Sequence, residues 1–159
     1  MAFTPLGLIP DHNGNLTNTK YLREKLQNDG TIFQTSTDSE LILHLIARSK
    51  ESKIEDKLLD AFSQTEGAYS ICILTDDKLI AARDPLGFRP LSVGKLNDAF
   101  VVASETCAFD IQHAEFLREV EPGELIVIDD EVIRTGNIKS FKINGNPEPK
   151  KFCVFEYIY

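Results

Sequence analysis

Residues 68–83, with the sequence AYSICILTDDKLIAAR, decide the fold class of this 159-residue chain. Apolar residues dominate 68–75, Asp76 and Asp77 interrupt them, and a second largely apolar run covers 78–83. Two such runs around a short polar turn predict a β-hairpin, because turn residues between apolar runs mark neighbouring strands. The pattern therefore indicates antiparallel sheet.

Three segments before this hairpin are predicted to be helices. The first ends just before Gly30, a residue type common past a helix end. The second starts after Thr37, because Thr37 and Glu40 have the spacing of a capping box, and the third covers residues 54–64. Helices early in the chain and antiparallel hairpins later predict an α+β domain with helices packed on antiparallel sheet.

Other strands are predicted on either side of the hairpin. Residues 3–10 form an edge strand at best, since Pro5 and Pro10 lack the N–H of a central strand. Asn13-Gly14 follows and favours a tight turn. The later strands are expected at residues 91–93 and 100–103, and as a second hairpin of 124–128 with 132–135 around residues 129–131.

Composition and charge limit the kinds of molecule that this chain is expected to bind. Hydrophobic residues make up 42% of the chain and charged residues 26%, which indicates one globular domain. The net charge of −8 disfavours nucleic acid and anionic membranes as partners, although a local basic pocket can still bind a phosphorylated substrate. No apolar run approaches the roughly 20 residues of a membrane span, and no secretory signal opens the chain.

The three cysteines are Cys72, Cys107 and Cys153, an odd number at wide spacing. Without a CxxC pair or a His/Cys cluster, they predict no zinc site. A reducing cytoplasm is the simplest location for such a chain. Cys107 is predicted to be a buried small hydrophobe rather than a nucleophile.

Two short segments are candidates for a binding site. Gly14 lets the backbone approach a ligand, and its N–H with the Asn13 amide supplies the two donors that a tetrahedral oxyanion needs. Asp38 offers a carboxylate to a substrate ammonium. Taken one at a time, an ordinary Asn-Gly turn and a helix-dipole role for Asp38 are the stronger interpretations. Residues 83–91 are interpreted chiefly as scaffold, in which the leading arginine and aspartate hydrogen-bond the loop.

Six strings, in this order, make the chain resemble the glutaminase domain of class II glutamine amidotransferases, which are N-terminal-nucleophile hydrolases. Among these it is most similar to the amidophosphoribosyltransferase family. The strings are HNGNL (12–16), STDSE (36–40), RDPLGFRPL (83–91), ASETC (103–107), EPGE (121–124) and FEYIY (155–159).

The resemblance implies a fold and a division of the chain. The family fold is a four-layer αββα sandwich with antiparallel sheets, of which this chain would hold a part. Residues 1–151 would be a partial glutaminase domain that lacks its N-terminal strands and its nucleophile. Residues 152–159 would begin the connection to an absent phosphoribosyltransferase domain.

The resemblance also implies roles for three residues. Asn13 and the Gly14 backbone would form the oxyanion hole for the side-chain amide of glutamine, and Asp38 would bind its α-amino group. In the family, an amino-terminal cysteine attacks with its own α-amino group as base, and an upstream arginine holds the α-carboxylate. Neither has a counterpart in this sequence, which opens with Met1-Ala2.

We therefore expect this chain, assayed by itself, to be an inactive fragment of the glutamine-hydrolysing, ammonia-producing domain that serves the first step of de novo purine biosynthesis. One alternative is half of a split class II amidotransferase, whose nucleophile another polypeptide supplies. Another is a non-catalytic glutamine-binding or assembly module, although the missing arginine predicts weak glutamine binding or none. Self-association through uncovered sheet edges and apolar surface is also expected.

Cofactors enter only through the resemblance. The complete enzymes use magnesium with phosphoribosyl pyrophosphate, and some members carry an iron–sulfur cluster. Cys153 resembles a cluster ligand of those members, but the other ligands would lie beyond Tyr159. No cofactor and no metal is expected in this chain.

Overall fold

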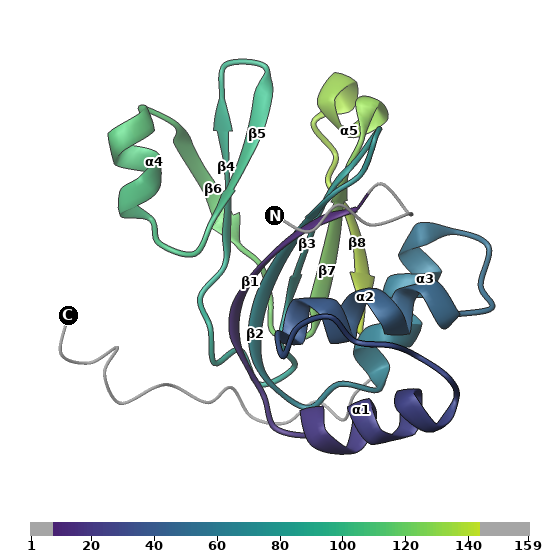
Figure 1. The fold of residues 1–159 in the computed structure, drawn as a ribbon. Coiled ribbons are helices and arrows are strands. Elements are labelled where there is room, and N and C mark those ends of the chain that lie inside the picture. Colours follow the sequence, from purple (N-terminus) through teal and green to yellow (C-terminus); the bar gives the residue numbers. More distant parts are fainter. Residues whose placement is uncertain (1–7, 144–159) are drawn as a thin grey trace, which may run out of the picture.

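Two antiparallel sheets lie face to face in the computed structural model, which describes residues 8–143 (Figure 1). The larger sheet has the strand order β1-β2-β3-β7-β8, and the smaller sheet has the order β5-β4-β6. The larger sheet consists of β1 (Ile9–Leu16), β2 (Gly67–Leu74), β3 (Leu79–Arg83), β7 (Glu124–Ile128) and β8 (Lys139–Lys142). The smaller sheet consists of β4 (Ser92–Leu96), β5 (Ala99–Ala103) and β6 (Glu115–Glu119). The helices are α1 (Thr19–Asn28), α2 (Asp38–Arg48), α3 (Ile54–Ser63), α4 (Cys107–Gln112) and α5 (Asp130–Thr135).

Two hydrophobic cores hold these layers together. One lies between α1–α3 and the larger sheet and includes the buried side chains of Leu41, Phe62 and Ile71. The other includes Ile126 of the larger sheet and Val93 of the smaller one, so it lies between the sheets. On the far side of the smaller sheet, α4 covers part of the surface (Figure 1). Helices, sheet, sheet and helix follow one another, which confirms the predicted α+β class.

The β2–β3 hairpin forms as the sequence predicts. Its register pairs Ile73 with Ile80, and the turn closes with a 2.9 Å hydrogen bond from the Thr75 N–H to the Lys78 carbonyl. The three early helices are confirmed as well. α2 begins after Thr37, but the Glu40 carboxylate accepts from the backbone N–H groups of Gln34 and Thr35 instead of closing a capping box.

The predicted second hairpin is wrong. β7 is a strand, but residues 130–135 form helix α5, because the Asp129 carboxylate accepts from the Val132 N–H at 3.1 Å and caps a helical turn. The strand that pairs with β7 is β8, further along the chain. Local β-branched residues favoured a strand here, and the capping carboxylate outweighs them.

The predicted turn at Asn13-Gly14 is also wrong, because both residues lie inside β1. This eight-residue strand pairs along its whole length with β2, from Ile9 opposite Leu74 to Leu16 opposite Gly67. β1 is the last strand of the larger sheet on its side, but the edge strand predicted at residues 3–10 overlaps it only at Ile9 and Pro10, and residues 3–7 lie outside the described range.

Some predictions fall on residues outside 8–143, namely the domain boundary at 151–152 and the role of Cys153. None of the helices within the described range combines the length and the apolar composition that crossing a membrane requires.

Candidate functional site

Gly14 presents its backbone N–H at the outer edge of the larger sheet. Its partner on β2 is Tyr69, whose carbonyl accepts from the Asp84 N–H at 2.9 Å and whose N–H donates to the Asp84 carboxylate at 3.3 Å. Both backbone groups of Tyr69 therefore point away from β1. In an antiparallel pair such positions leave the opposite residue facing outward as well. The Gly14 N–H thus points away from β2, on the side where no other strand of the described residues pairs.

Glycine is required at position 14 by close packing of the two strands. The residue has φ of 152°, and a Cβ atom there would lie 2.1 Å from the Ala68 carbonyl oxygen and 2.7 Å from the Tyr69 Cα. No side chain fits at those distances. The glycine therefore allows the close approach of β1 to β2.

The Asp38 carboxylate is hydrogen-bonded to the same edge of the larger sheet. The Leu16 N–H is the next outward group along β1, and it donates to Asp38 Oδ2 at 3.0 Å. Thr19 Oγ1 lies 3.2 Å from Asp38 Oδ1 and 3.0 Å from the Leu16 carbonyl oxygen. Asp38 is also the first residue of α2, where the helix dipole favours a carboxylate. The structure therefore brings Asp38 and Gly14 together, although 24 residues separate them in sequence.

Asn13 directly precedes Gly14 on β1, and it is exposed. Its partner on β2 is Ser70, so the two side chains share one face of the sheet. On that face Ser70 Oγ donates to the Pro90 carbonyl at 2.9 Å, which holds the 84–91 loop beside the strand. Asn13 and Gly14 are thus consecutive residues of β1, the first with its side chain on the face of Ser70 and the second with its backbone N–H on the side away from β2.

His12 lies on the opposite face from Asn13, beneath this edge. Its Nε2 atom is buried, with no hydrogen-bond partner among the described residues. Burial lowers the pKa of His12 from its ordinary 6.5, although the charges of Asp38 and Asp11 oppose the shift. The ring is therefore neutral at pH 7 and adds no cation next to Asp38.

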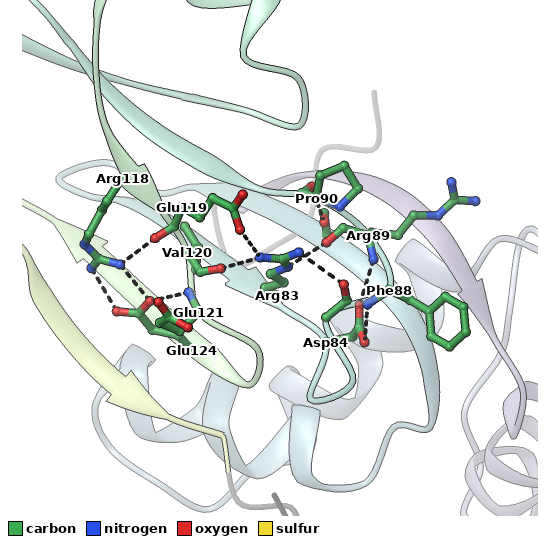
Figure 2. Close-up of polar contacts among 12 residues, drawn as sticks. Arg83, Asp84, Phe88, Arg89, Pro90, Arg118, Glu119, Val120, Glu121 and Glu124 are labelled. Carbon is green, nitrogen blue, oxygen red and sulfur yellow. Dashed lines mark hydrogen bonds and ion pairs between the residues drawn. The ribbon is translucent and has the colours of Figure 1, made fainter. Parts of the chain in front are cut away.

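The loop at 83–91 is scaffold, as predicted (Figure 2). The buried Asp84 carboxylate accepts backbone N–H groups of Leu86, Phe88 and Arg89 at 3.0–3.2 Å, in addition to that of Tyr69. Arg83 is also buried, and its guanidinium donates to the carbonyl oxygens of residues 87, 89 and 120. Two buried charged groups thus hold the loop against β2, beside the strand that carries Asn13.

Of the two described cysteines, Cys72 lies on β2 opposite Asp11 of β1, and Cys107 lies on α4. Burial and, to a smaller extent, the charge of Asp11 raise the pKa of Cys72 to about 11. Cys107 is exposed at the start of α4, so the prediction that it is buried is wrong. α4 turns Phe109, not Cys107, toward the smaller sheet, where the phenyl ring fills the space above Gly94. Among residues 8–143, no three His, Cys, Asp or Glu side chains are grouped to hold a metal.

Sequence reasoning missed Leu16 and Thr19, which hold the Asp38 carboxylate. A backbone N–H carries no residue-specific signal, and Leu16 is 22 residues from Asp38 in the chain. Only the packing of α2 against the end of β1 brings them together.

Comparison with known proteins shows the family of this chain. A family model described as "Glutamine amidotransferase domain" matches residues 7–110. The amidophosphoribosyltransferase of Bacillus subtilis is 48% identical over 148 residues, which are 93% of this chain and 30% of that protein. The chloroplastic amidophosphoribosyltransferase of Glycine max is 50% identical over 150 residues, which cover 93% of this chain and 25% of that protein.

A solved structure shares the fold over nearly the whole chain. It is glutamine phosphoribosylpyrophosphate amidotransferase from B. subtilis, complexed with ADP and GMP. The TM-score is 0.90 at 46% identity, and the match covers 98% of this chain and 33% of that one. The chain thus spans about a third or less of the length of these relatives. With a family model matching well over half of its residues, the chain belongs to the family of glutamine amidotransferase domains.

Proposed function

We propose that this chain is the glutamine-recognising part of an amidophosphoribosyltransferase, which releases ammonia from glutamine for the first step of purine biosynthesis. The observation that carries the proposal is the outer edge of β1. There the Gly14 N–H points away from the sheet, and the Leu16 N–H holds the Asp38 carboxylate. One strand edge thus offers a donor for an amide oxygen and an acceptor for an ammonium group.

In this role the Gly14 N–H and the Asn13 side-chain amide donate to the oxygen of the glutamine carboxamide. That oxygen becomes an anion when a nucleophile adds to the carboxamide carbon, and two fixed donors stabilise it. Removing one donor of such a site typically lowers the rate by roughly 10²–10³. The Asp38 carboxylate accepts hydrogen bonds from the α-ammonium group of glutamine and so orients glutamine along the outer edge of β1.

Hydrolysis also requires a nucleophile close to Asn13 and Gly14. Cys72 is partly buried and its pKa is raised, and Cys107 lies on α4 across the smaller sheet. We therefore expect the 159-residue chain, assayed by itself, to bind glutamine weakly without releasing glutamate. In the complete enzyme the ammonia would pass to phosphoribosyl pyrophosphate in a phosphoribosyltransferase domain that uses magnesium.

The proposal is tested by following amide and side-chain signals of the ¹⁵N-labelled chain by NMR during titration with millimolar L-glutamine. We expect shifts at the Asn13 side-chain amide, Gly14 and Leu16, and loss of these shifts in Asn13→Ala and Asp38→Asn. Asn15→Ala is the matched control, because Asn15 is an exposed asparagine on the same strand. Shifts that persist in Asp38→Asn, or their absence at saturating glutamine in the parent chain, would refute the proposal.

A further inference from the structure

The outward backbone groups of β1 form a short row with a fixed repeat. Pairing with β2 alternates along an antiparallel strand, so His12, Gly14 and Leu16 present their N–H groups on the free side. Consecutive members of such a row lie about 6.8 Å apart, because a strand rises about 3.4 Å per residue. The Asp38 carboxylate accepts a hydrogen bond from the Leu16 N–H. It therefore lies one two-residue strand repeat along the edge from the Gly14 N–H.

We propose that Thr19 is a positioning residue that, with the Leu16 N–H, fixes this separation and thereby selects glutamine over its shorter homologue asparagine. The inference rests on the proposed function. The Gly14 N–H receives the side-chain amide oxygen, and Asp38 receives the α-ammonium group. The number of methylene groups between those two parts of the ligand must then match one strand repeat.

Thr19 prevents the Asp38 carboxylate from rotating about its hydrogen bond to the Leu16 N–H. Leu16 N–H holds only Oδ2, at 3.0 Å, so the carboxylate could turn about that single bond. The single Thr19 hydroxyl hydrogen is shared by two acceptors, the other oxygen Oδ1 at 3.2 Å and the Leu16 carbonyl oxygen at 3.0 Å. Two contacts from one short segment therefore set both carboxylate oxygens.

The carboxylate retains capacity for a ligand in this arrangement. An ionised carboxyl group accepts about four hydrogen bonds, and each Asp38 oxygen here has one contact from Leu16 or Thr19. Asp38 is only half-buried, so its remaining lone pairs are accessible to an ammonium group. An asparagine that reached Asp38 would leave the Gly14 N–H without its acceptor.

The test compares binding of L-glutamine and L-asparagine to the full chain by NMR titration in Thr19→Val and Thr19→Ser. Valine keeps the shape of threonine but removes the hydroxyl, and serine restores the hydroxyl. Thr17→Val is the matched control, since Thr17 is exposed and its backbone N–H, which the substitution keeps, donates to the Glu66 carbonyl. Hydrogen exchange of the Leu16 amide, measured without ligand, reports directly on the Asp38 contact.

We expect the parent chain to prefer glutamine by roughly 10-fold or more, the usual effect of one methylene. Thr19→Val should weaken glutamine binding roughly 2- to 10-fold, as for a lost hydrogen bond, and leave asparagine binding unchanged. It should also speed exchange of the Leu16 amide, with both effects reversed in Thr19→Ser.

Equal loss for both ligands, or unchanged glutamine binding and unchanged Leu16 exchange in Thr19→Val, would overturn the role of Thr19 while leaving the proposed function intact. Failure of the parent chain to bind glutamine at all would instead overturn the proposed function, and the selectivity argument with it.

Discussion

Replacing Gly14 with alanine tests why a glycine stands at the centre of the site. The added Cβ would lie 2.1 Å from the Ala68 carbonyl oxygen, and φ of 152° is unfavourable for any residue with a side chain. Forcing extra atoms into a packed site costs about 1–3 kcal/mol, and a strained backbone angle about 1–3 kcal/mol more. We therefore expect Gly14→Ala to lower the free energy of unfolding by about 4 kcal/mol, a large share of the roughly 5–15 kcal/mol of a typical domain.

Alanine substitutions at two other glycines distinguish the cost of the steric clash from the cost of the positive φ. Gly67 faces the same strand pair, and a Cβ there would lie 2.4 Å from the Asn15 carbonyl oxygen. Gly30 also has a positive φ, of 86°, but no atom lies within 4 Å of its added Cβ. Gly67→Ala should therefore match Gly14→Ala, and Gly30→Ala should cost only about 1–2 kcal/mol.

The assay is equilibrium unfolding in urea followed by circular dichroism, with midpoints and slopes compared among the three variants. If Gly14→Ala were no more destabilising than Gly30→Ala, close approach of β1 to β2 would not be the reason for the glycine. If the reasoning holds, loss of glutamine binding in Gly14→Ala cannot be assigned to the oxyanion donor alone.

Three further predictions concern stability, pH and thiol reactivity. Asp84→Asn should lower the melting temperature by roughly 6–12 °C, because it replaces an acceptor of four backbone N–H groups and costs about 3 kcal/mol; Asp77→Asn, in an exposed turn, should change it little. Burial raises the pKa of Glu124, but hydrogen bonds from Arg118, Ser140 and the Glu121 N–H outweigh it and lower the pKa from its ordinary 4.5. The folded state then binds fewer protons than the unfolded state below pH 4.5, so stability from this group falls on acidification, and Glu124→Gln should flatten the urea midpoint against pH in that range. At pH 8, mass mapping after brief alkylation should find the exposed Cys107 labelled before the partly buried Cys72, whose pKa is near 11; equal labelling would contradict the raised pKa of Cys72.

The parts of the fold that sequence reasoning predicts correctly are those with local causes. The β2–β3 hairpin has its turn between its strands, and α2 starts where Thr37 and the acidic residues of the first turn favour it. β6 and β8 are not predicted, because they have only five and four residues and no turn signal joins either of them to its partner in the sheet. Asn13-Gly14 was assigned to a turn because the dipeptide prefers one, and eight residues of pairing with β2 override that preference.

The candidate site also has a part that the sequence predicts and a part that only the structure shows. Asn13, Gly14 and Asp38 were proposed from family strings, and the structure places Gly14 and Asp38 on one edge. That their separation is set by Leu16 and Thr19 could not be read from the sequence, because it depends on where α2 packs against β1.

The outer edge of β1, which no other strand within residues 8–143 covers, also bears on whether the expected self-association can proceed by joining two sheets. An exposed strand edge is a template for intermolecular pairing and hence for aggregation. Here Pro10 stands at an outward position and has no N–H to donate, while Asp38 already occupies the Leu16 N–H. Only the N–H groups of His12 and Gly14 are left between them, a stretch too short for a stable ladder. Self-association of this chain should therefore proceed through surfaces other than this edge.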